Sequence, residues 1–182
     1  GSFVKYEGLD LLLEACSILK EKHGDIFRLL LVGDGDTMQL LRRTARFLQL
    51  EDQVVFTGRV SHDEVQKYYS LIDIAPLPRK GLRVCELVSP LKPFEAMGSG
   101  KVLVTSSVQA LAEIVQDGVT GLVFEKDNSQ DLADKLEIVL LDEKLRSEMG
   151  VNANKWVKEN HSWEVISERV TKIYDEILEG KQ

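Results

Sequence analysis

The chain has few cysteines and few histidines, and these shortages exclude several kinds of protein. Two cysteines, Cys16 and Cys85, among 182 residues cannot build the disulfide framework of a small secreted domain, and their spacing matches no metal site. The three histidines, His23, His62 and His161, stand far from one another in the sequence, and we expect them to be surface or capping residues. We therefore expect a protein of a reducing compartment, the cytoplasm, without a bound metal.

Long apolar runs are absent as well. No run approaches the roughly 20 residues of a membrane-spanning helix, and no signal peptide is visible. The 43% hydrophobic and 29% charged residues are typical of a soluble globular protein. The formal net charge of −7 argues against binding nucleic acid or an anionic membrane surface, because both would repel the chain, but it leaves room for a local basic pocket.

Five short apolar runs alternate with longer segments of helical spacing. The runs that predict strands span 28–33, 53–58, 73–78, 101–106 and 120–125, with 2–4 as a further candidate. The helical segments span 8–22, 36–49, 62–71, 109–115, 129–141, 143–158 and 163–178. This alternation predicts an α/β fold, a Rossmann-like three-layer sandwich around a mostly parallel sheet. We expect one domain, 1–182, in which residues 143–182 form a helical extension.

Local signals refine this outline. Ser61 followed by Glu64 predicts a capping box at the start of the third helix. Residues 79–89 are expected to form a long, irregular, basic loop after a strand. Parallel sheets bind ligands beyond the carboxyl ends of their strands, and long loops there are often functional.

Gly33 and Gly35 look like part of a phosphate-binding loop. The third glycine of a dinucleotide fingerprint is missing, and Asp34 and Asp36 would repel a pyrophosphate. A tight turn into the next helix explains the glycines better, and a contact between Gly33 and a ligand is kept as the alternative.

The segment PLKPFEAMGSGK (90–101) carries the strongest chemical signal. Pro90 is expected to open a helix whose free N–H groups favour an anion, with Arg79 and Lys92 nearby. Glu95, one turn later, has the two oxygens needed to accept hydrogen bonds from the adjacent hydroxyls of a ribose. A solvated basic loop and a first-turn acid that complements the helix dipole are the alternatives. Taken together, these residues favour a nucleotide with its phosphates at the helix start.

Five segments, in this order and at these spacings, resemble the carboxyl-terminal, donor-binding domain of retaining glycosyltransferases with the GT-B fold, group 1 or family 4 type. They are GSFVKYEGLDLLLEA (1–15), LLLVGDGD (29–36), VVFTGRVSHDEVQKYYSLIDIAPLPR (54–79), ELVSPLKPFEAMGSGKVLVTSS (86–107) and EIVQDGVTGLVF (113–124). Within these segments, PLKPFEAM and DGVTGLVF contribute most to the resemblance. The resemblance covers nearly the whole chain.

The resemblance implies an enzyme, soluble or peripheral at a membrane, that transfers a sugar from a UDP- or GDP-sugar with retention of configuration. It implies no metal and no other cofactor. The acceptor would bind mainly to a preceding amino-terminal half that this chain lacks, so the isolated domain is expected to be inactive alone. Two alternatives stay open: a sugar-nucleotide epimerase or phosphorylase of the same architecture, and a non-catalytic α/β binding module.

The family carries a pair of glutamates with seven residues between them. Glu95 matches the second, which holds the ribose hydroxyls in the family. Eight residues separate Glu86 from Glu95, and Leu87 stands at the expected first position. Glu86 and Leu87 therefore compete for the role of contact to the donor sugar.

The resemblance also implies contacts to the phosphates and the base. Residues at the helix start that meets the phosphates are Pro90, Leu91 and Lys92, and the loop that lies against the base is Gly58, Arg59 and Val60. Many members neutralise the pyrophosphate with an arginine and a lysine near the first strand. An ungapped match puts Ser2 and Glu7 there instead. We therefore hypothesise that Arg79 and Lys92 supply the missing positive charge during catalysis.

Overall fold

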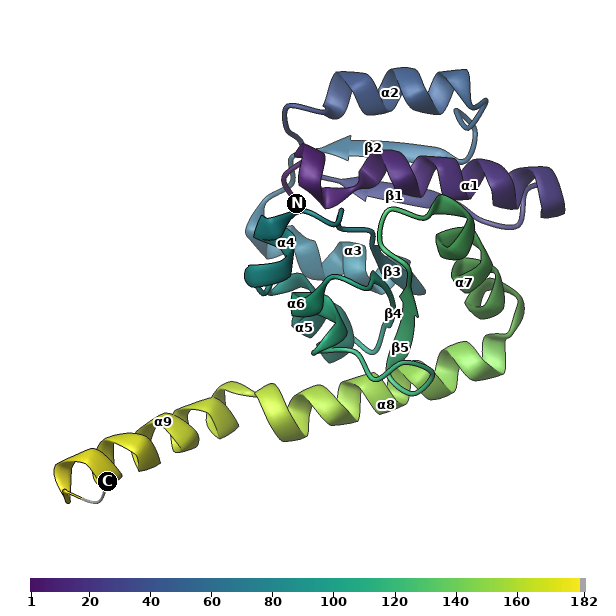
Figure 1. Cartoon of the computed structure of the whole chain (residues 1–182). Coiled ribbons are helices and arrows are strands. Elements are labelled where there is room, and N and C mark those ends of the chain that lie inside the picture. The colour runs from purple at the N-terminus through teal and green to yellow at the C-terminus, as the bar shows by residue number, and fades with distance from the viewer. Residues whose placement is uncertain (181–182) are drawn as a thin grey trace.

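The computed structural model describes residues 1–180 and has the α/β architecture that the sequence predicts (Figure 1). Its strands are β1 (Leu29–Val32), β2 (Val54–Gly58), β3 (Ile74–Leu77), β4 (Val102–Ser106) and β5 (Gly121–Phe124). Its α-helices are α1 (Leu9–His23), α2 (Met38–Phe47), α3 (Val65–Leu71), α4 (Arg83–Leu87), α5 (Lys92–Gly98), α6 (Gln109–Ala112), α7 (Ser129–Leu141), α8 (Glu143–His161) and α9 (Trp163–Leu178). Short 3-10 turns, η1 (Lys5–Glu7) and η2 (His62–Glu64), precede α1 and α3.

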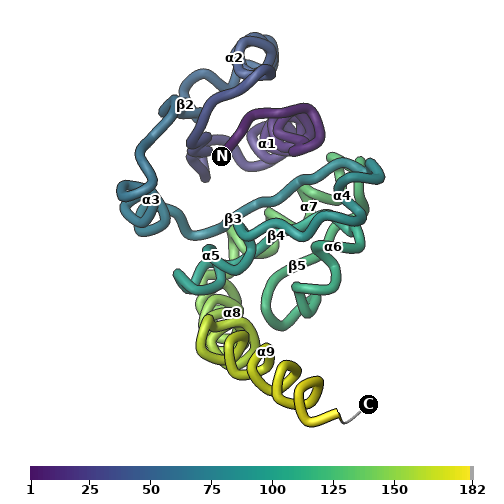
Figure 2. Tube along the Cα trace, turned by 90° about the vertical axis from the view of Figure 1, so that its left-hand side faces the viewer, coloured from purple at the N-terminus to yellow at the C-terminus, as the bar shows by residue number. Residues whose placement is uncertain are grey.

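All strand pairs are parallel, but the described strands form two sheets rather than the single sheet expected. β1 pairs with β2, and β3, β4 and β5 pair in that order. Figure 2 shows β2 apart from β3, β4 and β5. The α/β, Rossmann-like class with parallel strands is confirmed, and the described strands are divided between two sheets.

β4 shows why the strand sequences are nearly all apolar. Each of its residues is buried, so it is covered on both faces. Val102 and Val104 pack in one core cluster, with α1 and α7, whereas Leu103 packs in a second cluster with α5 and α8. Alternate residues of a strand point to opposite faces, so helices cover β4 on both sides.

Residues 2–4, the further strand candidate, do not form a strand. Ser2 makes an isolated parallel bridge with Asp34, and the chain then turns through η1 into α1. Gly8 joins them with a φ of 70°, and a Cβ on it would lie 1.8 Å from the carbonyl oxygen of Pro78. Glycine is therefore required at position 8, where the start of α1 meets the chain that follows β3.

Three local predictions need correction. The segment 79–89 is not wholly irregular, because α4 lies within it. α5 begins at Lys92, with Leu91 as its N-cap, so Pro90 precedes the helix instead of opening it. The capping box at Ser61 is not formed: its hydroxyl donates to the Glu64 carboxylate at 3.0 Å and accepts no backbone N–H.

The carboxyl-terminal helices differ in how they contact the rest of the chain. α8 places Ala153 and Val157 in the second core cluster, whereas α9 has no buried residue and extends away from the sheets (Figure 1). The expected extension, 143–182, therefore begins with a helix that is part of the core. Residues 181–182 lie outside the described part of the chain.

Candidate functional site

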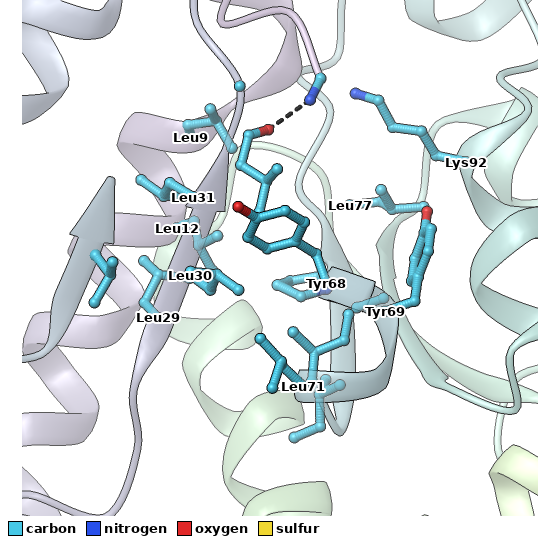
Figure 3. Close-up of a pocket in the computed structure, with 18 of the residues that line it drawn as sticks. Leu9, Leu12, Leu29, Leu30, Leu31, Tyr68, Tyr69, Leu71, Leu77 and Lys92 are labelled. Carbon is cyan, nitrogen blue, oxygen red and sulfur yellow. Dashed lines mark hydrogen bonds between the residues drawn. The ribbon is translucent and has the colours of Figure 1, made fainter. Parts of the chain in front are cut away.

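A cavity of about 960 Å³ lies between β1 and β3 and reaches past their carboxyl ends to Gly33 and Pro78. Its polar rim contains Gly33, Asp34, Arg59, Lys92 and Glu95. Its deeper walls are apolar: Figure 3 shows Leu29, Leu30 and Leu31 on one side and Leu77 on the other. The rim lies where ligands of parallel α/β sheets bind.

Lys92 and Glu95 line this cavity together. They stand three residues apart on α5, a spacing that puts them on neighbouring positions of one helix face. The Tyr69 hydroxyl donates to Glu95 Oε2 at 3.1 Å and so fixes the orientation of the carboxylate. Burial, followed by the adjacent Glu95 charge, raises the pKa of Tyr69, which keeps the phenol protonated as a donor.

Glu7 joins the two cations that the sequence assigns to phosphate binding. Its Oε1 accepts from Arg79 Nη2 at 3.2 Å, and its Oε2 lies 2.5 Å from Lys92 Nζ. The side chains of Glu7 and Arg79 are 11% and 10% exposed, whereas that of Lys92 is 36% exposed. Lys92 can therefore reach a ligand, while Arg79 is held inside by Glu7 and by the Val88 carbonyl at 3.0 Å.

The loop after β2 contributes part of the rim. Arg59 and Val60 line the cavity, and Gly58 precedes them with a φ of 73°. Gly58 also accepts a hydrogen bond from the Gly33 N–H at 3.0 Å, which holds the ends of β1 and β2 together. The structure thus brings this loop to the same opening as Lys92 and Glu95.

Gly33 has a structural reason to be glycine. Its φ is 135°, and a Cβ would lie 1.8 Å from the carbonyl oxygen of Gly1. The close approach of the first residues therefore requires glycine at position 33.

Other predicted residues lie away from the cavity. Glu86 accepts from the Gln109 N–H and from Lys126 Nζ, both at 2.6 Å, and is not among the residues that line the cavity. Lys126 first, and then the Gln109 N–H, lower the pKa of Glu86. Leu87 and Leu91 are 70% exposed, Pro90 is buried, and none of the three lines the cavity.

Sequence reasoning missed two residues of the site. Glu7 was treated as a departure from the family pattern, yet it is the acid that pairs with both predicted cations. Tyr69 was assigned to a helix without a role, and only the packing of α3 beside α5 shows that it reaches Glu95. The one available signal in the sequence was Glu7 itself, an acid at a position where many members of the family carry a basic residue.

The described residues, 1–180, offer neither a group of metal ligands nor a membrane-spanning helix. No group of three or more His, Cys, Asp and Glu side chains is placed to hold a metal ion in this part of the chain. Within the same residues, no helix has the length and apolarity required to cross a bilayer.

Comparison with known proteins decides the family. The family model described as glycosyl transferases group 1 matches residues 1–156. The chain belongs to this family. An uncharacterized glycosyltransferase of Methanocaldococcus jannaschii is 29% identical over 98% of this chain and 44% of its own length. A GDP-mannose-dependent phosphatidylinositol monomannoside mannosyltransferase of Mycobacterium tuberculosis is 27% identical over 92% of this chain and 44% of its own. This group 1 chain thus spans less than half of either relative.

Solved structures show the same fold. The C-terminal domain of a group 1 glycosyl transferase from Francisella tularensis has a TM-score of 0.78 and 24% identity, over 90% of this chain and 84% of that domain. HepE from Anabaena, solved with UDP, has a TM-score of 0.78 and 21% identity, over 96% of this chain and 48% of its own. The group 1 chain thus has the architecture of one half of a GT-B glycosyltransferase.

Proposed function

We propose that this chain is the donor-binding half of a retaining glycosyltransferase and that it holds a UDP- or GDP-sugar at the polar rim of the cavity. The observation that carries the proposal is the placement of Lys92 and Glu95 on one face of α5, at the opening that Arg59 and Val60 also line. A diphosphate needs a cation and a ribose needs an acceptor for two hydroxyls, and α5 offers both one turn apart.

Each of these residues has its own role in binding the nucleotide-sugar. Lys92 binds the diphosphate and stabilises the charge that develops as it leaves the sugar. Glu95, oriented by Tyr69, accepts hydrogen bonds from the ribose hydroxyls. Arg59 and Val60 lie against the base. Arg79 acts through Glu7. Because Arg79 also pairs with the Glu7 carboxylate, the ion pair between Glu7 and Lys92 is weakened.

The relatives support a nucleotide-sugar ligand without choosing its base. One relative is named for its dependence on GDP-mannose, and one structural neighbour contains UDP. This chain spans under half of the length of these relatives. We therefore also propose that the acceptor binds to an amino-terminal domain of the whole enzyme. We propose a peripheral membrane association only for this whole, two-domain enzyme.

Calorimetric titration of UDP, GDP and ADP into the chain tests the proposal. Lys92→Met and Glu95→Gln should each weaken the binding of the preferred nucleotide by about 10- to 100-fold, as expected for the loss of a charge-assisted hydrogen bond. Lys155→Met and Glu159→Gln, on the exposed side of α8, make the matched control pair and should leave affinity unchanged. Saturable binding that neither α5 variant weakens would remove the assignment.

A non-catalytic binding module is the second candidate, and one observation favours it. Glu7 occupies a position where many group 1 members carry a base, and its carboxylate neutralises part of the charge that a diphosphate needs. This candidate predicts no saturable binding of any nucleoside diphosphate in the same titration. An epimerase or phosphorylase would bind the nucleotide or a sugar phosphate and would need a catalytic acid or a cofactor lysine of its own.

A further inference from the structure

A group of apolar side chains beside the proposed donor site is exposed to solvent. Leu82, Val84, Leu87, Val88 and Leu91 follow one another closely, and their exposed fractions range from 45% to 70%. Val84 stands three positions before Leu87 and four before Val88, so these three share one side of α4 and its C-cap. We call the exposed side chains of residues 82, 84, 87, 88 and 91 the α4 face.

The opposite side of α4 is anchored in the fold. Cys85 is fully buried in a further core cluster, against α6. Glu86 accepts the hydrogen bond of the Gln109 N–H, and the Val88 carbonyl accepts one from Arg79 Nη1 at 3.0 Å. The α4 face therefore belongs to an element that packing and hydrogen bonds hold in place. Apolar side chains that such an element leaves together in water are typical of a contact surface.

The α4 face adjoins the residues proposed to bind the diphosphate. Leu91 is the N-cap of α5 and directly precedes Lys92. The Val88 carbonyl binds Arg79, which shares the carboxylate of Glu7 with Lys92. Figure 1 shows α4 on the side of the molecule toward which the arrow of β2 points, the side of the carboxyl ends of the strands. Since the donor sugar is bonded to the diphosphate, an acceptor that approaches it comes close to this face.

Arg83 adds a cation beside the α4 face. It is exposed, and within residues 1–180 no hydrogen bond or ion pair engages its guanidinium. It stands four positions before Leu87, on a neighbouring position of the helix. A guanidinium binds a phosphate through paired N–H donors. The hydroxyls of a glycan would lose water against these apolar side chains without gaining hydrogen bonds. A molecule with an apolar chain and a phosphate matches both features.

We propose that the sugar acceptor is an anionic lipid whose apolar chain lies on the α4 face and whose phosphate pairs with Arg83. This inference rests on the proposed function, and it selects one class among the possible acceptors. In the transfer, a hydroxyl oxygen of the lipid bonds to the anomeric carbon of the sugar. The bond from that carbon to the diphosphate oxygen breaks, and the hydroxyl proton passes to the departing diphosphate. The α4 face thus contributes the part of the acceptor site that binds the lipid chain.

Short-chain lipids test the proposal on the chain without nucleotide. Dihexanoyl phosphatidylglycerol, kept monomeric, should bind saturably and shift the amide NMR signals of residues 82–91. Glycerophosphoglycerol has the same head group without the apolar chains, and dihexanoyl phosphatidylcholine has the same chains without a net charge. Each should bind at least about five-fold more weakly, because each lacks one of the two matched features. A saturating nucleoside diphosphate should leave the binding of the lipid in place, since donor and acceptor must be bound together.

Substitutions of exposed side chains locate the binding surface. Val84→Ser combined with Leu87→Ser should weaken the binding of dihexanoyl phosphatidylglycerol by about ten-fold. Arg83→Gln should remove the preference for phosphatidylglycerol over phosphatidylcholine. Leu40→Ser combined with Phe47→Ser, at exposed apolar positions of α2, is the matched control and should leave lipid binding unchanged.

Several results would overturn the proposal. They are binding that the α4 variant does not weaken, equal affinities for the three probes, shifts only outside residues 82–91, and exclusion of the lipid by nucleotide. A dimer that the α4 variant abolishes would assign the face to a second copy of the chain. Protection of residues 82–91 from hydrogen exchange in the whole enzyme without lipid would assign it to the other domain.

Separate titrations of the nucleotide and the lipid distinguish this inference from the proposed function. Nucleotide binding without lipid binding rejects the lipid acceptor alone. Lipid binding without nucleotide binding rejects the donor site, and with it the assignment of the lipid as an acceptor.

Discussion

Glu7 sets the charge of the cavity rim. Its buried carboxylate lies between two cations, of which Arg79 is inside the protein and Lys92 faces the opening. A diphosphate that binds Lys92 must compete with this carboxylate. The strength of nucleotide binding should therefore depend on a residue that does not itself touch the nucleotide.

Glu7→Gln is expected to change affinity and stability in opposite directions. The affinity for the preferred nucleoside diphosphate should rise about five-fold, because Lys92 loses a partly exposed ionic partner worth about 1 kcal/mol. The free energy of unfolding should fall by about 2–4 kcal/mol, because the buried guanidinium of Arg79 loses its counter-charge. Calorimetry measures the first change and urea denaturation the second.

Asp10→Asn is the matched control for this variant. The Asp10 carboxylate pairs with Lys80 at 2.5 Å but is 39% exposed, so its loss should cost less than about 1 kcal/mol and leave nucleotide affinity unchanged. Equal effects of the two substitutions on affinity would contradict a specific role for Glu7.

Tyr69→Phe tests the orientation of Glu95. The substitution keeps the ring, which packs beside the second core cluster, and removes the hydroxyl that donates to Glu95. Nucleotide affinity should fall by about three- to ten-fold, the value of one hydrogen bond, with little change in stability. Tyr68→Phe removes the hydroxyl of the other tyrosine that lines the cavity and should have no such effect. Identical affinities for the two variants would argue against the role.

At the scale of elements, Glu86 connects three segments that are distant in sequence. From α4 it accepts a hydrogen bond from the first N–H of α6 and pairs with Lys126, in the turn after β5. This is the position of a helix cap, filled by a carboxylate from another helix, where negative charge complements the helix dipole. Glu86 therefore stabilises the fold around α6.

The contribution of Glu86 to stability should depend on pH. Its pKa in the folded chain lies below the ordinary value of 4.5, so its stabilising effect is present above about pH 4.5 and is lost as the pH falls through the folded-state pKa. Glu86→Gln should therefore lower the urea midpoint at pH 7, and the difference from the unsubstituted chain should shrink below about pH 4.5. A constant difference down to pH 3 would contradict this role.

α9 should be dispensable for the fold. It has no buried residue, and Trp163, Ile177 and Leu178 are among its exposed apolar side chains. Truncation after Ser162 should lower the free energy of unfolding by less than about 1 kcal/mol, whereas Leu132→Ala, in the core face of α7, should cost about 2–5 kcal/mol. A truncated chain that unfolds as readily as the Leu132 variant would assign α9 a structural role.

The sequence predicts these elements well where apolar spacing is strong and poorly where it is weak. Each of the five strands lies within two residues of its prediction, because a short apolar run between turns has few alternatives. α4 was missed because five residues with three apolar side chains, two of them exposed, show no helical stripe. At the site, Lys92, Glu95 and the 59–60 loop were predicted together, but the partners of Arg79 and Glu86 depend on tertiary packing.

At the scale of the whole molecule, one cavity has two parts that differ in polarity. Its rim at the carboxyl ends of the strands is charged, and its deeper part between β1 and β3 is apolar. Alternating strands and helices predict parallel pairing but do not say which strands are neighbours, so the division of the described strands between two sheets could not be predicted.

The pairing of Glu95 with a ribose is tested most directly by one double comparison in calorimetry. UDP or GDP, whichever binds, and its 2′,3′-dideoxy analogue are titrated into the unsubstituted chain and into Glu95→Gln. We predict that Glu95→Gln lowers the affinity for the ribose nucleotide by about ten-fold or more and leaves the affinity for the analogue unchanged. Only the ribose nucleotide offers hydroxyls to Glu95. Equal losses for both nucleotides, or no loss for either, would contradict a donor site built on α5.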